Sequence, residues 1–346
     1  MRIDSIGVRV PSRRVTNDDI LQWLEEHSPG TSTILLKTYQ RVVRGLFKAA
    51  GSEIRYMRDA TKNEKASQFI IGAMNDALEQ AHLSAGEIDL LIYCGVGKGF
   101  LEPANAYFYA QKLGMGCSCF DIVDACMSWI RALEISYEFF KSGRYKHVMI
   151  VNGEFNSHHG FPDNFKIKDL RQVEYTFPTY TIGEAASATL LSASDQEWKF
   201  AFKSLPELAD LCTIPLAGYD NFVEPTKRLG RNGLNNFVSY GREMFDAARN
   251  YLAPLVKDLV GDLNEPDIYF PHAASDSAYL AASKTMSLPI DKMFAKVFPS
   301  YGNLVSASIP MGMHMALREG KLNRGNKVVF CPASAGMVYG AVQFAF

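Results

Sequence analysis

The stretch Phe120-Asp-Ile-Val-Asp-Ala-Cys126, followed by the amphipathic segment 127–140, decides the fold class. An apolar run that leads into a helix-period segment predicts a strand, a sharp turn and a helix, with a thiol on the turn. A thiol at a helix N-terminus lies at the positive end of the helix dipole, which favours the thiolate. Because thiolate is the nucleophilic form, Cys126 is the candidate for acyl-transfer chemistry. The alternative is a small buried core cysteine, the commoner case for a lone cysteine.

A pattern of helix, turn and strand occurs twice along the chain. Its members are the helical segments 66–82 and 243–259, the turns 86–89 and 264–267, and the strands 90–94 and 268–270. Asp89 and Asp267 are 178 positions apart, and Val148 and Val328, in a second pair of strands, are 180 apart. An offset this constant predicts an internal duplication, although helix followed by strand is common in any α/β chain.

Helix-period and strand-period segments alternate in both halves, which predicts βα units around mostly parallel sheets. The runs 148–151 and 328–330 are continuously apolar, as expected of strands buried on both faces. The first helix is predicted over 18–26, with Asn17 as its N-cap. Residues 33–50 predict an additional helix, whose wide apolar stripe packs on an acyl pocket, a partner subunit or the core.

The composition is that of an ordinary globular enzyme with a large core, with 346 residues, 47% hydrophobic and 21% charged. A net charge of −1 gives no electrostatic reason to expect nucleic acid or an anionic membrane as a partner. We find no apolar signal core and no run of membrane-spanning length. The cysteines form no CxxC pair, so we expect free thiols in a reducing cytoplasm and no metal site. They are Cys94, Cys117, Cys119, Cys126, Cys212 and Cys331.

Two further residues could serve the nucleophile. His272 directly follows the strand 268–270, at the carboxyl end where α/β folds place their sites. The duplication offset takes Cys126 close to Val305, so the thiol and Asn303 are expected on equivalent loops that can meet at a pseudo-twofold axis. Alone, His272 would be an ordinary loop residue and Asn303 an ordinary turn residue. Their combination with Cys126 favours a Cys-His-Asn site.

Several segments share one family pattern. They are Ile6-Gly-Val-Arg-Val-Pro11 with Thr16-Asn-Asp-Asp19, Phe120–Cys126 with Lys141-Ser-Gly143 and Val151-Asn-Gly-Glu154, Phe270-Pro-His272, Tyr301-Gly-Asn-Leu-Val-Ser-Ala-Ser-Ile-Pro310, and Ser334-Ala-Gly-Met-Val-Tyr-Gly340. On these segments the chain resembles, nearly from end to end, the 3-oxoacyl-acyl-carrier-protein synthase III-like condensing enzymes of the thiolase superfamily. The asparagine segment, 301–310, is the most specific match.

The resemblance implies an internally duplicated, five-layered αβαβα fold. Its N-terminal half (1–190) would carry the nucleophile, and its C-terminal half (191–346) would carry His272 and Asn303. Cys126 would take an acyl group from a thioester, while the backbone N–H groups of Cys126 and Gly336 bind the oxyanion. A second thioester would then form a carbon–carbon bond by Claisen condensation, with His272 and Asn303 donating to its enolate oxygen. The family acts as a homodimer on acyl-CoA or acyl-carrier-protein thioesters, without a bound cofactor.

Glu102, in Leu101-Glu-Pro-Ala104, is a possible base. A malonyl-type donor loses CO2 and needs no base, whereas a plain acyl-CoA donor must lose a proton. In enzymes that join two fatty acyl-CoA chains head to head, a glutamate in similar context serves as that base and reaches the partner subunit's site. The alternative is a solvated loop glutamate.

Some positions depart from the family's common pattern. After His272 the chain reads Ala273-Ala-Ser-Asp-Ser277 instead of Gln-Ala-Asn and a basic residue that helps to dock acyl carrier protein. The tryptophan that stacks on the CoA adenine is absent, and Phe47 is its nearest equivalent. Gly183-Glu-Ala-Ala186 replaces Gly-Asp-Gly-Ala, and Asp124 replaces a small residue. These departures favour specialised fatty acid or polyketide biosynthesis over the housekeeping initiator.

Other functions stay open at this point. An acyltransferase would keep acyl-Cys126 but pass the acyl group to an alcohol or amine, and a non-catalytic subunit would only shape a partner's pocket. A thiol hydrolase is a further option. We expect Gly95-Val-Gly-Lys-Gly99 to form a tight active-site or interface loop, and His158, His159 and Asp163 to lie in a solvated loop rather than at a metal. The aromatic residues between 161 and 180 line an acyl tunnel or pack in the core.

Overall fold

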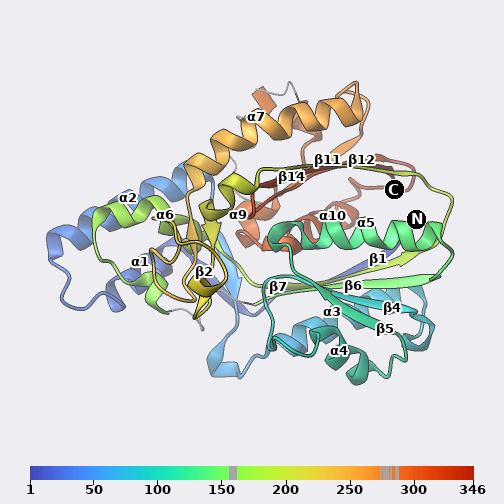
Figure 1. Cartoon of the computed structure of the whole chain (residues 1–346), viewed down its shortest axis with the longest axis horizontal. Coiled ribbons are helices and arrows are strands. Elements are labelled where there is room, and N and C mark those ends of the chain that lie inside the picture. Colours follow the sequence, from blue (N-terminus) through green and yellow to red (C-terminus); the bar gives the residue numbers. More distant parts are fainter. Residues whose placement is uncertain (156–161, 273–274, 276–279, 281–282, 285–287) are drawn as a thin grey trace.

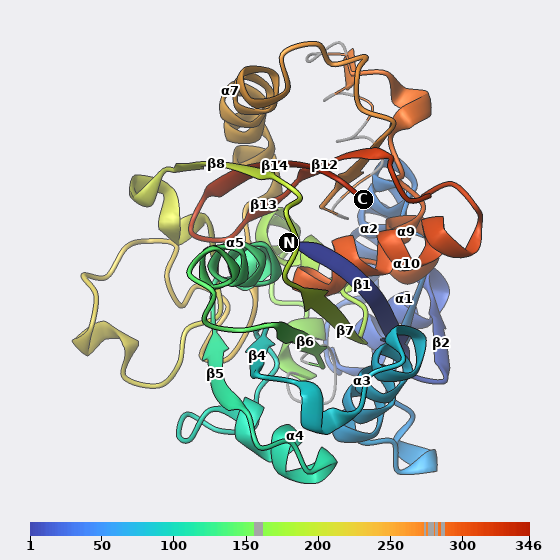
Figure 2. The ribbon, with the colours of Figure 1, turned by 90° about the vertical axis from the view of Figure 1, so that its right-hand side faces the viewer.

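The structure is a computed structural model that describes residues 1–155, 162–272, 275, 280, 283–284 and 288–346. Five layers follow one another across it, as Figures 1 and 2 show. Helix α7 (Gly241–Val260) forms one outer layer, and α3 (Ala66–Ala81) and α4 (Asn105–Leu113) form the other. Two sheets lie inside these, and α5 (Ser128–Lys141) and α10 (Ser308–Arg318) fill the layer between the sheets. The predicted αβαβα architecture is confirmed.

The two sheets repeat one topology. In the first, the strand order is β1 (Arg2–Arg9), β7 (Ala185–Ser192), β6 (His147–Glu154), β4 (Leu90–Cys94) and β5 (Ser118–Ile122). In the second, β8 (Trp198–Ser204), β14 (Val338–Ala345), β12 (Lys327–Cys331) and β11 (Ile268–Pro271) follow in the same order, and the short β13 (Ala333–Ser334) also pairs with β14. In the first sheet, the pairs β1–β7 and β7–β6 are antiparallel and the pair β6–β4 is parallel. In the second sheet, the pairs β8–β14 and β14–β12 are antiparallel and the pair β12–β11 is parallel. The chain therefore builds one sheet twice.

Matching hydrogen bonds confirm the duplication at the residue level. The N–H of Asp89 donates to the His147 carbonyl, and the N–H of Asp267 donates to the Lys327 carbonyl. In return, the Asp89 carboxylate accepts from the N–H of His147 at 2.9 Å, and the Asp267 carboxylate accepts from the N–H of Lys327 at 2.8 Å. The aspartates that gave the offset in the sequence thus fasten equivalent strands in both sheets.

The main core fills the space between the sheets. There Trp129 of α5 lies against Phe330 of β12, with ring centroids 5.4 Å apart. Burying a side chain of this size stabilises the fold by about 1.5–3 kcal/mol. The continuous apolar runs predicted as doubly covered strands are the central strands β6 and β12.

A side lobe packs against one end of the layers (Figure 1). It contains α1 (Asn17–Glu26), α2 (Thr33–Ala50), α6 (Val173–Thr176) and the pair β2 (Arg13–Thr16) and β3 (Ile54–Met57). Helix α2 has the predicted bounds. Its apolar face packs on α1 and on Phe165 and Tyr180, so core packing explains that stripe. Besides 3-10 turns, the other α-helices and strands given for the described residues are the short β9 (Cys212–Thr213), β10 (Val238–Ser239) and α9 (Val297–Tyr301).

The predicted N-cap of the first helix is wrong by one residue. Thr16, not Asn17, caps α1, because its hydroxyl accepts from the Asp19 N–H while the Asp19 carboxylate accepts from the Thr16 N–H. The Asn17 side chain instead donates to the Ser52 carbonyl at 2.7 Å. Within the described part of the chain, no helix combines the length and apolar character needed to cross a membrane.

Candidate active site

Cys126 lies in a single 3-10 turn, Ala125–Met127, between β5 and α5. We name it the Cys126 turn. Ala125 has a φ of +44°, so the chain turns sharply before the thiol. The Ser128 hydroxyl holds this bend, because it accepts from the Asp124 N–H and donates to the Ala125 carbonyl, both at 2.8 Å. The predicted strand, turn and helix are confirmed.

A second turn repeats this geometry 180 residues later. Val305–Ala307, which we name the Ser306 turn, precedes α10, and Val305 has a φ of +50°. The Ser306 turn contacts the Cys126 turn. Just before it, the side-chain oxygen of Asn303 accepts from the Val305 N–H at 2.9 Å. That bond orients the carboxamide and leaves its NH2 group as the donor that Asn303 can offer.

Two crossed ties hold these turns against the opposite half of the chain. The Ser306 N–H donates to Glu154 at the end of β6 at 3.2 Å, and the Ser306 hydroxyl also donates to Glu154. In the other direction, Ser334 of β13 accepts from the Met127 N–H at 3.2 Å and donates to the Asp124 carbonyl at 3.1 Å. Glu154 and Ser334 are again 180 positions apart. The two halves therefore hold each other's turns through equivalent positions.

The electrostatics of Cys126 differ from the prediction. Burial raises the pKa of its thiol well above the usual range, and the nearby Cys212 and Glu154 raise it further. The backbone N–H groups of Cys126 and Ala335 act in the opposite direction but do not outweigh burial. The expected thiolate is therefore wrong for the resting site, because desolvation of the sulfur exceeds the effect of its place before α5.

His272 lies where the sequence predicts, directly after β11. Its N–H donates to the Cys331 carbonyl of β12 at 3.3 Å, and the continuation of that strand, β13, contacts the Cys126 turn. Burial lowers the pKa of His272 to about 4, so the imidazole is neutral near pH 7. A neutral imidazole carries one N–H donor and one acceptor nitrogen.

Gly336 and Glu102 lie on exposed turns. Gly336 follows β13, directly after Ala335, with a φ of +76° that favours glycine. Glu102 lies on the loop between β4 and α4, and the residue is exposed. Cys126, His272, Asn303 and Gly336 therefore follow the ends of core elements, whereas Glu102 lies outside them.

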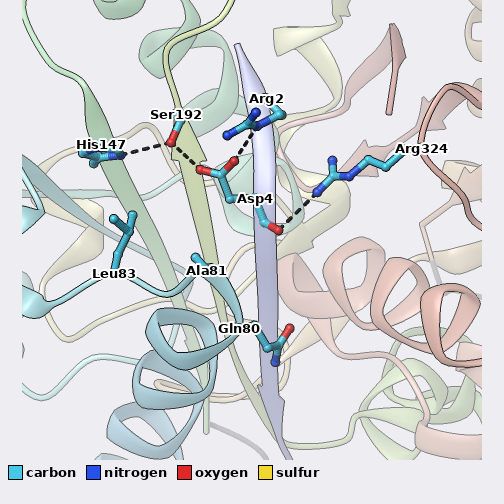
Figure 3. A pocket seen from close by; sticks show the side chains of 8 residues that line it. All are labelled: Arg2, Asp4, Gln80, Ala81, Leu83, His147, Ser192 and Arg324. Atoms are coloured by element: carbon cyan, nitrogen blue, oxygen red, sulfur yellow. Dashed lines mark hydrogen bonds and ion pairs between the residues drawn. The ribbon is translucent and has the colours of Figure 1, made fainter.

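Two cavities between described residues lie away from the Cys126 turn. One, of about 520 Å³, is lined by the loop 97–100 and by residues of α3 and α4. The other, of about 490 Å³, lies at the amino ends of β1 and β6 and the carboxyl end of β7, and is shown in Figure 3. There Asp4 accepts from Ser192 and Arg2, and Arg324 donates to the Ile3 carbonyl, so these polar groups pair with one another. We assign neither cavity to the Cys126 chemistry.

Phe47 and the described aromatic residues Phe165 and Tyr180 are core residues. Phe47 is buried and packs against Phe177 and under the Arg55 guanidinium, so its ring is not available to stack on an adenine in this structure. Phe165 and Tyr180 pack in the same cluster. His158, His159, Phe161 and most of 273–277 lie outside the described residues. Among those described, no three His, Cys, Asp or Glu side chains form a group that could hold a metal.

Sequence reasoning missed the residues behind the site. Glu154, Ser306 and Ser334 appeared there only as members of the family segments, with no role of their own. The 180-residue offset was the available signal, because it pairs Cys126 with Ser306 and Glu154 with Ser334.

Sequence comparisons match this chain to one family along its length. The profile described as 3-oxoacyl-[acyl-carrier-protein] synthase III matches residues 120–205, and the profile for its C-terminal part matches 261–346. The chain belongs to the synthase III-like condensing enzymes. The β-ketoacyl-[acyl-carrier-protein] synthase III of Neisseria meningitidis serogroup B is 26% identical over 354 residues, covering 100% of this chain and 99% of the relative. That of Aquifex aeolicus is 27% identical over 302 residues, covering 84% and 87%.

Two solved structures share the fold of this chain along nearly its whole length. A crystal structure of Xanthomonas campestris OleA with bound lauric acid and lauroyl-CoA superposes with a TM-score of 0.82 at 20% identity, covering 99% of this chain and 98% of that one. The synthase III from Aquifex aeolicus VF5 gives 0.79 at 23% identity, covering 100% and 99%. The family is one of acyl-transferring condensing enzymes, and the Cys126 turn lies within the first matched profile.

Proposed function

We propose that this synthase III-like chain joins two acyl thioesters by Claisen condensation, in a ping-pong reaction through an acyl-Cys126 intermediate. The observation that carries the proposal is the meeting of the Cys126 turn with the Ser306 turn. One turn carries a nucleophile, and the other follows an Asn303 whose NH2 group is oriented as a donor. His272 at the end of β11 supplies a second donor from the same half.

In the first step, Cys126 attacks the carbonyl carbon of an acyl thioester. A new S–C bond to Cys126 forms, the bond to the carrier's sulfur breaks, and the thiol proton ends on the departing thiolate. Because the pKa of Cys126 is raised, we infer that the proton leaves as the attack proceeds rather than before it. The neutral imidazole of His272 has an acceptor nitrogen that could carry this proton in transit.

Backbone donors would stabilise the oxyanion of this step. We assign this role to the N–H groups of Cys126 and Gly336. The contact between the sulfur and the Ala335 N–H supports the assignment, because it brings the 335–336 turn next to the nucleophile. Loss of one such donor typically costs about 2.7–4 kcal/mol of transition-state stabilisation.

In the second step, a carbanion derived from another thioester attacks the acyl-Cys126 carbonyl. The carbanion forms when a malonyl-type donor loses CO2 or when a plain acyl donor gives up a proton to a base. The C–C bond then forms, the C–S bond to Cys126 breaks, and the released Cys126 thiolate takes up a proton from water. His272 and Asn303 would donate to the enolate oxygen of the attacking thioester, a role that a neutral imidazole N–H and a carboxamide NH2 can fill. Asn303 cannot act as a base, so its part is electrostatic.

The carrier is CoA or acyl carrier protein. The curated relatives are named as acyl-carrier-protein synthases, and the OleA structure contains lauroyl-CoA. We further propose specialised fatty acid or polyketide metabolism, in the cytoplasm, where six unpaired thiols would be stable. No bound cofactor enters the scheme, because both steps use only thioester chemistry.

A homodimer would complete the site. Strand β5 is an edge strand of its sheet, and exposed apolar side chains gather beside it on the preceding loop, on α4 and after β5. They are Phe100, Leu101, Tyr107, Phe108 and Val123. Glu102 lies in the same loop as Phe100 and Leu101, so in a dimer formed through this patch Glu102 would lie at the interface with the second copy. We propose that Glu102 is the base for unactivated acyl donors in the partner subunit's site.

Intact-protein mass spectrometry tests the proposed intermediate. Wild type incubated with a panel of acyl-CoA and acyl-carrier thioesters should gain the mass of the acyl group, and Cys126→Ala should not. Acylation that persists in Cys126→Ala would refute the mechanism. The products separate the rival function: condensation gives a new C–C bond, whereas acyl transfer to an alcohol or amine gives an ester or amide.

The role of Glu102 has its own test. Glu102→Ala should abolish condensation of unactivated acyl-CoA but leave condensation with malonyl thioesters intact, because decarboxylation needs no base. An equal loss with both donors would remove Glu102 as the base.

A further inference from the structure

Glu154 is a buried carboxyl group that the two-step scheme does not use. It ends β6 and is 1% exposed. One of its oxygens accepts from the N–H and the hydroxyl of Ser306, and the other accepts from the Val96 N–H at 3.3 Å. Gly95 approaches so closely that a Cβ there would lie 2.6 Å from the Glu154 Oε1 atom. The carboxyl group therefore joins the loop after β4 to the Ser306 turn.

The direction of the Ser306 hydroxyl is fixed by a second neighbour. The side-chain NH2 of Asn152 donates to the Ser306 Oγ at 2.8 Å, so the Ser306 hydroxyl is an acceptor from Asn152 and donates its own hydrogen to Glu154. Both Glu154 oxygens are then acceptors in every contact described for them. This arrangement suits a carboxylate, which accepts only, better than a carboxylic acid, which must donate once.

A short chain of contacts connects Glu154 to the Asn303 carboxamide. Glu154 holds Ser306, the preceding residue is Val305, and the Val305 N–H fixes the Asn303 side-chain oxygen. Val305 is β-branched and has a φ of +50°, a conformation that persists only where its surroundings hold it. Glu154 provides two of the bonds that do so.

The equivalent tie in the other half uses a neutral group. Ser334 holds the Cys126 turn through the Met127 N–H and the Asp124 carbonyl. The molecule thus contains two ties at equivalent positions, one behind the nucleophile and one behind Asn303. They act on turns that serve different half-reactions.

We propose that Glu154 is a positioning residue for the condensation half-reaction, acting through Ser306 on Asn303, and that Ser334 is its counterpart for the acylation half-reaction. This inference rests on the proposed function. It assigns Glu154 no contact with substrate or reacting atoms.

The test measures the two half-reactions separately. Acylation is followed by intact-protein mass spectrometry in a single turnover with an acyl-CoA, and condensation by product release after malonyl-CoA is added to pre-acylated enzyme. Ser306→Ala and Glu154→Gln should slow condensation about 10- to 100-fold, because displacement of a positioned group has effects of this size. Their acylation should stay close to wild type. Ser334→Ala, the matched control, should show the reverse pattern.

A pH profile gives a second readout that a purely structural role would not move. Burial raises the pKa of Glu154 to about 7, with Ser306 and the 96–97 backbone opposing it. Protonation removes an acceptor, so the wild-type condensation rate should fall below about pH 7, and Glu154→Gln should lack this break. Titratable groups that interact with Glu154 are Tyr93 and Cys94 of β4 and Cys126, whose pKa values are all raised, so they stay protonated here.

The outcomes are distinct. If Glu154→Gln and Ser306→Ala slow both half-reactions equally, or acylation alone, the positioning role is wrong. If Glu154→Gln fails to fold, as circular dichroism would reveal, Ser306→Ala decides by the same criterion. If wild type forms no acyl-Cys126 with any thioester, the proposed function fails instead.

Discussion

Ala125 and Val305 hold backbone that L-residues rarely adopt, and they stand at equivalent positions before Cys126 and Ser306. Such a conformation costs roughly 1–3 kcal/mol at each residue. Neither position is a glycine, which would adopt this backbone without strain. The chain therefore keeps its strain at the two turns that meet in the candidate site, and the ties from Ser334 and Glu154 offset it.

Two buried titratable residues, Glu154 and His272, should make the free energy of unfolding depend on pH in opposite directions. The pKa of Glu154 is raised from 4.5 to about 7, so its contribution is present below pH 4.5 and is lost as the pH rises to 7. The pKa of His272 is lowered from 6.5 to about 4, so its contribution is present above pH 6.5 and is lost as the pH falls to 4. Each amounts to about 3 kcal/mol across its window.

Single substitutions should expose these opposed slopes. Between about pH 4.5 and 6.5 they cancel in wild type, so His272→Gln should lose stability relative to wild type as the pH rises, and Glu154→Gln should gain it. The expected slope is about 1.4 kcal/mol per pH unit in each case. Urea unfolding at four pH values in this range measures it. Parallel curves for both variants and wild type would contradict the prediction.

At the scale of elements, local pattern predicted well wherever a segment decides its own structure. Helix α2, strand β4 and the strand–turn–helix at Cys126 have the expected positions, because apolar period and turn residues are local signals. The pKa of Cys126 was predicted in the wrong direction, because the dipole argument is local and burial is not. Cys212 and Glu154, which add to the shift, come from other strands. Phe47 was matched by position to an adenine-stacking residue, and only packing reveals it as core.

The Asn303 segment should be intolerant of added volume at Gly302. This residue has a φ of +74°, and a Cβ there would lie 2.3 Å from the Thr181 carbonyl oxygen. Gly320, at the end of α10, has a φ of +67° but nothing within 4 Å of such a Cβ. Both Gly302→Ala and Gly320→Ala carry the backbone strain, and only Gly302→Ala carries the clash.

Chemical unfolding of the two alanine variants separates these effects. Gly302→Ala should lose about 1–3 kcal/mol more than Gly320→Ala, the usual cost of overpacking. It should also condense more slowly, because the clash displaces Asn303. Equal losses in the two variants would mean that the Thr181–Gly302 contact relaxes freely and does not fix the segment.

At the scale of the whole molecule, the chain passes from the first sheet to the second between β7 and β8. The hydrogen bonds of Glu154 to Ser306 and of Ser334 to the Cys126 turn connect the two halves. Strands of the first sheet end at Ser192, and those of the second begin at Trp198. We retain as a proposal the halves 1–190 and 191–346, the first with the nucleophile and the second with His272 and Asn303. Because each half holds the other's turn, neither half would build the site alone.

The edge strand β5 makes a prediction about assembly. Asn105 of α4 donates to the Asp121 carboxylate of β5 and accepts from the Gly99 N–H, so the loop that bears Glu102 is fastened to this edge. Val123, 58% exposed, directly follows β5.

Light scattering should give wild type a mass of twice 38.5 kDa. Val123→Glu should shift it toward monomer, because a charge buried in an interface without a partner is costly. Val223→Glu, at a residue 51% exposed in the segment between β9 and β10, is the matched control and should stay dimeric. Monomeric Val123→Glu should also lose condensation of unactivated acyl-CoA, since Glu102 would no longer enter a partner's site. A wild-type monomer that condenses acyl-CoA fully would contradict both the dimer and the place of Glu102 in it.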